Sequence, residues 1–157
     1  MALDLKSYSR QNLEDARDRY LEDLAALPDA AFDQSPGGAA RSPAHFTYEI
    51  VCVNRRLATR LRGEDPGPFN PTLWETTPDE YRVLALASQA FSNSTQEFLE
   101  ALESISMDDM ERDIPTPSGQ TTPFDLSMFC AMHINYHDGQ LNYIQSLNGD
   151  VDIHWTD

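Results

Sequence analysis

Two histidines, four residues apart, are the part of this sequence best suited to chemistry. His133 and His137 lie in the run CAMHINYHDGQ at residues 130–140, inside an apolar segment that favours a helix. A spacing of four places both imidazoles on one face of a helix. Burying two polar rings costs free energy that a bound cation repays, and imidazole is a common zinc ligand. The pair therefore predicts half of a metal site.

His45 is the candidate for the missing ligand. It lies in the first turn of another predicted amphipathic helix, where it can point toward the axis of a helical bundle. Three histidines with one open position form a known catalytic zinc site, and imidazole also suits nickel and iron(II). Glu49, one turn further on, shares a face with His45. It could be a fourth ligand, a carboxylate that orients a ring, a general base, or an ordinary surface or interface carboxylate.

Several better-known sites do not fit the sequence. His133 is not followed directly by the glutamate of the zincin proteases. Neither His133 nor His137 has a glutamate three residues before it, as the di-iron bundles require. The sequence also lacks the nucleophile elbow of a serine hydrolase. A pair of hydrogen-bonded core histidines without a metal stays open as the structural interpretation.

Four segments without proline supply the helices that would position these residues. Each carries an apolar stripe at helical spacing, and all ten prolines fall between the segments or at their starts. The segments span about residues 7–27, 43–62, 78–106 and 123–148. The pattern predicts an all-α protein, a four-helix bundle that forms a single domain over residues 1–157.

Three of the predicted helix and connector boundaries carry further signals. Ser42, Thr77 and Thr122 each precede a proline, which predicts a hydroxyl N-cap followed by proline at the first helical position. Glu80 would complete a capping box with Thr77. The Pro/Gly/Thr-rich piece at residues 114–122 predicts a small hairpin or lid between the third and fourth helices.

The charge balance argues against several kinds of partner. With 26 acidic and 11 basic residues, the net charge of −15 repels nucleic acids and anionic membrane surfaces. No apolar stretch approaches the roughly 20 residues that span a bilayer. The sequence shows no basic region followed by an apolar run at its start, so we expect a cytoplasmic protein. Cys52 and Cys130 are expected to be reduced core thiols.

Four arginines gather in the second half of the second helix. Because a positive charge there complements the helix dipole and nearby carboxylates, we assign them to this structural role and not to a substrate. These residues are Arg55, Arg56, Arg60 and Arg62.

The histidine pair also carries a family resemblance. The run MHINYHDGQLNYI, together with the single histidine near the start of the second helix, resembles the DinB superfamily of DinB/YfiT-like metalloenzymes. The resemblance implies a four-helix bundle with up-down-down-up connectivity, a homodimer, and a divalent cation held by His45, His133 and His137. Relatives with an assigned activity use the metal to ionise a low-molecular-weight thiol, such as bacillithiol or mycothiol, for transfer or isomerisation.

Residues and resemblance together predict a metal-dependent enzyme that performs thiol-dependent S-transfer or related nucleophilic chemistry. The cofactor would be zinc or nickel, with iron as a further option, and Glu49 would be the candidate base. The partners would be a small-molecule thiol and an electrophile. The alternative is a non-catalytic bundle, stress-linked or structural, that binds metal without turnover or binds none.

Overall fold

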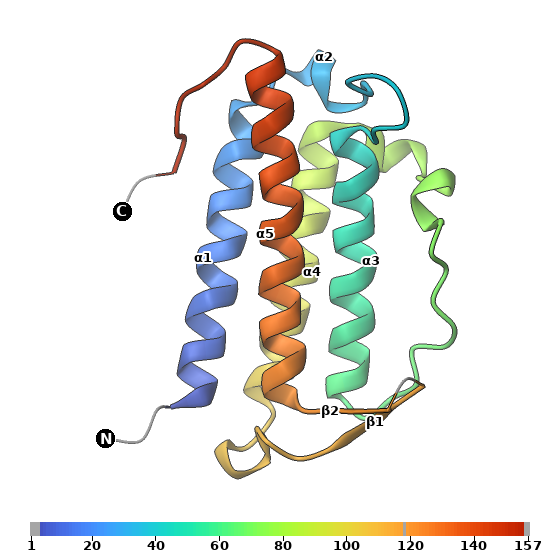
Figure 1. The fold of residues 1–157 in the computed structure, drawn as a ribbon. Coiled ribbons are helices and arrows are strands. Elements are labelled where there is room, and N and C mark those ends of the chain that lie inside the picture. The colour runs from blue at the N-terminus through green and yellow to red at the C-terminus, as the bar shows by residue number, and fades with distance from the viewer. Residues whose placement is uncertain (1–3, 118, 156–157) are drawn as a thin grey trace.

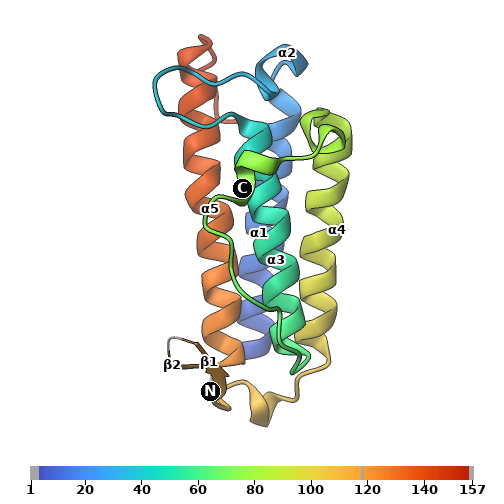
Figure 2. The same ribbon diagram turned by 90° about the vertical axis from the view of Figure 1, so that its right-hand side faces the viewer.

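Four long helices dominate the computed structural model, which describes residues 4–117 and 119–155. They are α1 (Leu5–Ala26), α3 (Pro43–Leu61), α4 (Leu84–Glu103) and α5 (Pro123–Leu147). The helices lie side by side, with α1 and α5 running in one direction and α3 and α4 in the other (Figures 1 and 2). α3 packs most extensively on α4, and α1 on α5. The prediction of a predominantly helical protein is confirmed.

Short elements fill the connections between these helices. The helix α2 (Asp29–Phe32) follows α1, and 3-10 helices span Leu73–Thr76, Asp79–Arg82 and Met107–Asp109. Strands β1 (Ile114–Thr116) and β2 (Gly119–Thr121) form an antiparallel hairpin at the end of the molecule where α5 begins (Figure 1). This confirms the predicted hairpin. No helix in the described ranges is both long and apolar enough to cross a membrane.

Two of the three predicted N-caps form. The side-chain oxygens of Ser42 and Thr122 accept the backbone N–H three residues on, at 3.4 and 3.0 Å, at the starts of α3 and α5. The prediction for Thr77 is wrong, because its hydroxyl donates to the carbonyl of Trp74 at 2.6 Å and closes the preceding turn. The next residues form only a 3-10 helix, and α4 begins at Leu84 without a side-chain cap.

The buried core also contains a polar network that joins three helices. Asn54 on α3 is fully buried, and its Nδ2 donates to Ser94 Oγ and Thr95 Oγ1 on α4 at 3.3 and 3.1 Å. The thiol of Cys130 on α5 donates to Asn54 Oδ1 at 3.2 Å. Burial raises the pKa of Cys130, so the thiol stays protonated. Cys52 is also free of a disulfide, as expected.

A second buried polar group lies between α1 and α5. Asp23 and Asp138 are 0% and 7% exposed, and Asn142 Nδ2 donates to Asp23 Oδ2 at 2.8 Å. Burial and the neighbouring carboxylate of Asp23 raise the pKa of Asp138 to about 7. Two buried carboxyls so placed cannot both ionise easily. The pair therefore holds a proton up to near-neutral pH.

Candidate metal centre

Three ionisable side chains converge where the first half of α3 faces the middle of α5. Nε2 of His133 and Nε2 of His137 are 3.2 Å apart, and Glu49 reaches them from α3. Glu49 Oε1 lies 3.8 Å from His133 Nε2, and Oε2 lies 3.8 Å from His137 Nε2. Among the described residues, these are the only three His, Cys, Asp or Glu side chains whose donor atoms meet within 4.8 Å. We call them the triad.

Aromatic side chains pack against both histidines of the triad. The ring of Phe46 stacks on His137, with centroids 5.4 Å apart and an interplanar angle of 11°. Phe129 stacks on His133 at 5.9 Å and 12°, and Tyr136 meets His137 edge-on at 5.0 Å. The side chain of His137 is consequently only 1% exposed. This low-dielectric setting strengthens any interaction with a charged ligand.

The hydrogen bonds of the triad leave donor atoms directed at a common point. Burial and the adjacent His133 lower the pKa of His137 to about 4, so its ring is neutral at physiological pH. His137 Nδ1–H donates to Gln140 Oε1 at 2.9 Å, which leaves the lone pair on Nε2. Burial opposes ionisation of Glu49, but His133 and Arg41 outweigh it and hold the pKa of the carboxyl well below its usual range. A neutral nitrogen and a carboxylate are the forms that bind metals.

The donor set fits a divalent cation. Two histidine nitrogens that bind one zinc ion tetrahedrally, each at about 2.0–2.1 Å, would lie about 3.3 Å apart, close to the observed 3.2 Å. His133 Nδ1 is buried and has no hydrogen-bond partner in the described part of the chain, so the ring of His133 lacks the outer partner that Gln140 provides for His137. Two histidines and one carboxylate are known sites of catalytic zinc and of non-haem iron(II).

Gln140 holds His137 in the orientation that the triad requires. Outer partners of metal-binding histidines contribute 10–100-fold to metal affinity or activity in comparable sites. We therefore expect Gln140→Ala to weaken zinc binding about tenfold, measured by titration calorimetry, without loss of the fold by circular dichroism. Gln89→Ala, at an exposed position of α4, is the control and should leave the affinity unchanged.

The structure does not bring His45 into the triad. Its ring lies on the side of α3 that faces Asp33 and Arg82, and burial together with the charge of Arg82 lowers its pKa. The reason is rotation along the helix, about 100° per residue. Phe46, one residue later, is the side chain that stacks on His137, and Glu49 follows it by three residues on the same face.

Arg41 is a member of the site that the sequence did not indicate. Its Nη1 forms an ion pair with Glu49 Oε2, and its guanidinium also lies 4.4 Å above the ring of Trp74. It precedes the N-cap of α3, in a connector without a pattern of its own, so no sequence signal marks it. Glu49 could have been preferred to His45 from the apolar stripe alone, because it lies three residues after Phe46 and four before Val53.

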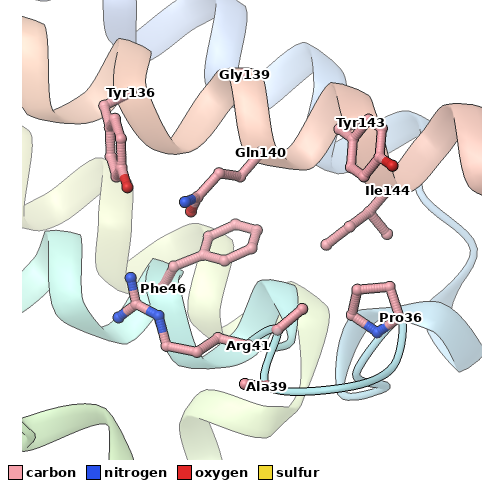
Figure 3. A pocket seen from close by; sticks show the side chains of 10 residues that line it. Pro36, Ala39, Arg41, Phe46, Tyr136, Gly139, Gln140, Tyr143 and Ile144 are labelled. Carbon is pink, nitrogen blue, oxygen red and sulfur yellow. The ribbon is translucent and has the colours of Figure 1, made fainter.

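Two open pockets flank the triad. The first has a volume of about 520 Å³, and the side chains of Arg41, Phe46, Tyr136 and Gln140 converge at one end of it (Figure 3). Arg41 and Gln140 are direct partners of triad residues. The second, of about 540 Å³, includes Glu49 and His133 themselves. A small molecule can therefore reach Glu49 and His133 through the second pocket, whereas the first pocket lies against Arg41 and Gln140.

Comparisons with known proteins bear on the family and the fold of the chain. A family model described as the DinB superfamily matches residues 12–141. No curated protein matches the sequence.

Three solved structures share the fold. A conserved protein from Enterococcus faecalis has 19% sequence identity and a TM-score of 0.71, over 93% of this chain and 98% of its own. A DinB-like protein from Bacillus cereus ATCC 10987 has 15% identity and a TM-score of 0.73, over 95% of each chain. A mycothiol-dependent maleylpyruvate isomerase has 14% identity and a TM-score of 0.66, over 87% of this chain and 60% of its own.

Proposed function

Because the chain belongs to the DinB superfamily, we propose that it is a metal-dependent enzyme whose triad binds a divalent cation for nucleophilic chemistry with a low-molecular-weight thiol. The observation that carries the proposal is the convergence of Glu49, His133 and His137 on one point. The proposed cation is zinc, nickel or iron(II), since a carboxylate with two imidazoles suits each of them.

Each residue of the site has a defined task in this proposal. When bound, a divalent cation lowers the pKa of a coordinated thiol or water and so supplies a nucleophile at neutral pH. His137 offers a neutral nitrogen, Nε2 of His133 lies 3.2 Å from it as the second nitrogen donor, and Gln140 fixes the ring of His137. Arg41 orients the carboxylate of Glu49. Since that carboxylate already faces two imidazoles and a guanidinium, we assign Glu49 to metal binding and not to proton transfer.

We propose a thiol and an electrophile as the reactants on the basis of the family and the fold. A structural neighbour is a mycothiol-dependent isomerase, and at 14% identity this likeness concerns the fold alone. The pocket that includes Glu49 and His133 supports a reaction with a small molecule, and the pocket beside Arg41 and Gln140 offers space for a second one. We propose S-transfer to an electrophile as the reaction class.

A non-catalytic role is the second candidate, and one observation favours it. Arg41 neutralises Glu49, so the carboxylate is not an unpaired buried charge without a metal. In that case the histidines would fill the core and the protein would be a structural or stress-linked bundle.

We also propose an oligomeric state, a helix connectivity and a cellular location for the protein. We propose the up-down-down-up four-helix bundle of the family, in a cytoplasmic homodimer. Exposed apolar side chains along the outer face of α5 support the dimer, since a contiguous stripe of this kind is typical of interfaces. They are Phe129, Met132, Tyr136, Tyr143 and Leu147.

An assay of thiol consumption distinguishes the proposed enzyme from the non-catalytic bundle. We expect zinc-loaded protein to accelerate thioether formation between a low-molecular-weight thiol and 1-chloro-2,4-dinitrobenzene at least about tenfold over the same protein in EDTA, because ionisation of the thiol is what the cation supplies. Bacillithiol, mycothiol and glutathione are tested in turn, followed by absorbance. His137→Ala should abolish the acceleration and His154→Ala, in the C-terminal segment, should retain it. Equal rates in all samples, with metal bound, would establish the non-catalytic candidate.

A further inference from the structure

The pocket that contains Glu49 and His133 also contains an arginine without a partner. Within the described ranges, each of the other nine arginines forms a hydrogen bond or an ion pair. Arg60, on the last turn of α3, forms neither, although it is partly buried and the protein carries a net charge of −15. Glu64 and Asp65 line a neighbouring pocket together with Arg60, but neither forms an ion pair with it. A guanidinium that has no protein partner and lies beside an apolar pocket can bind an anion.

One wall of this pocket is the segment at residues 66–69, and Arg56 holds that segment in place. Its guanidinium donates to the carbonyl oxygens of Pro66, Gly67 and Pro68, at 2.9, 2.8 and 3.1 Å, and lies 5.6 Å from the ring centroid of Phe69. In Figure 2 this segment passes in front of α3 and α5, and its residues Pro66 and Phe69 line the pocket. Since these bonds use most of the donors of Arg56, its role is to build the pocket, and Arg60 is left to bind a ligand.

The remaining lining is apolar. Val53 and Leu57 lie between Glu49 and Arg60 on α3, and Phe69 and Phe129 contribute two aromatic rings. Arg60 follows Glu49 by eleven residues, which is about three turns and about 16 Å along the helix axis. A ligand that reaches from one end to the other must therefore be elongated.

We propose that this pocket binds a reactant with a carboxylate at Arg60, an apolar or aromatic body along α3, and its reacting end at His133 and Glu49. The inference rests on the proposed function, since it names the class of electrophile that the triad would serve. It reverses the assignment of Arg60 to a structural role, which the sequence had suggested.

The first test is binding of 6-phenylhexanoate by titration calorimetry. We expect Arg60→Gln to weaken the affinity about 10–100-fold, because a hydrogen bond to a charged group contributes about 1.5–3 kcal/mol. Arg62→Gln is the matched control, since Arg62 lies two residues away, donates to the backbone oxygen of Glu97 at 3.2 Å and does not line the pocket. The neutral probe 6-phenyl-1-hexanol should bind the wild type and Arg60→Gln equally.

Two outcomes would overturn the pocket assignment. One is equal affinity of Arg60→Gln and Arg62→Gln for 6-phenylhexanoate, and the other is wild-type binding of the alcohol as tight as that of the carboxylate. Both measurements are made in EDTA, so they do not depend on the metal. Failure of the proposed function would appear instead as absent metal binding while the dependence on Arg60 persists.

The second test concerns the orientation of the ligand. In protein loaded with cobalt(II), we expect faster NMR relaxation of the phenyl protons of bound 6-phenylhexanoate than of the methylene protons beside its carboxylate. Paramagnetic relaxation increases steeply at short distance, so the order of the two effects reports which end is nearer the triad. The opposite order would refute the proposed direction of binding.

Discussion

Glu49→Gln is expected to lower the zinc affinity of the protein by about 100-fold, while His45→Ala leaves it unchanged. The amide keeps the size of the carboxylate but removes the charge that a divalent cation requires. Loss of a direct ligand should cost at least as much as loss of an outer partner, for which 10–100-fold is typical. Glu49 lies 3.8 Å from both His133 and His137, whereas His45 faces Asp33 and Arg82.

Titration calorimetry on protein stripped with EDTA measures this effect directly. A zinc-dependent rise in melting temperature gives an independent value, because a ligand that binds only the folded state stabilises it. His154→Ala is the control for a histidine outside the site, since its ring pairs with Asp150 in the C-terminal segment. If His45→Ala lowered the affinity and Glu49→Gln did not, the three-histidine site would be correct and the geometry described above would not be the metal-bound one.

The helices could be predicted because their signals are local. Apolar stripes at helical spacing and proline at the starts of α3 and α5 place both helices within a residue of their observed bounds. The start of α4 could not be predicted in the same way. Thr77 has the composition of an N-cap, but its hydroxyl bonds backward to Trp74, a choice that depends on how the preceding connector folds.

The site was predictable only in part. The spacing of His133 and His137 fixes their common face without any tertiary information. Which residue of α3 meets them depends on how that helix is rotated against α5, and a rotation of about 100° separates consecutive residues. The contacts of Arg41 depend on the connector before α3, and the surroundings of Arg60 depend on the connector after α3; neither connector has a helical periodicity that could be read from the sequence. Arg41 pairs with Glu49 because the connector folds back on the first turns of α3, and Arg60 lies where the connector after α3 presents no carboxylate that pairs with it.

Asn54→Ala is expected to destabilise the protein by about 2–4 kcal/mol, the largest effect on stability that we predict for a polar residue. The substitution leaves a cavity and removes the acceptor of the Cys130 thiol. It also removes the donor that joins α3 to Ser94 and Thr95 on α4. Since all four residues are buried, no water replaces these bonds without entering the core.

Urea unfolding of the protein in EDTA, followed by circular dichroism, measures this loss without a contribution from metal. Asn93→Ala removes the same side chain from an exposed position of α4 and should change the free energy of unfolding by less than about 0.5 kcal/mol. Asn54→Asp should be at least as harmful as alanine, because it places a carboxylate in the core with no cation beside it. A loss below about 1 kcal/mol for Asn54→Ala would mean that the network contributes only its net hydrogen-bond energy and that the helices repack around the gap.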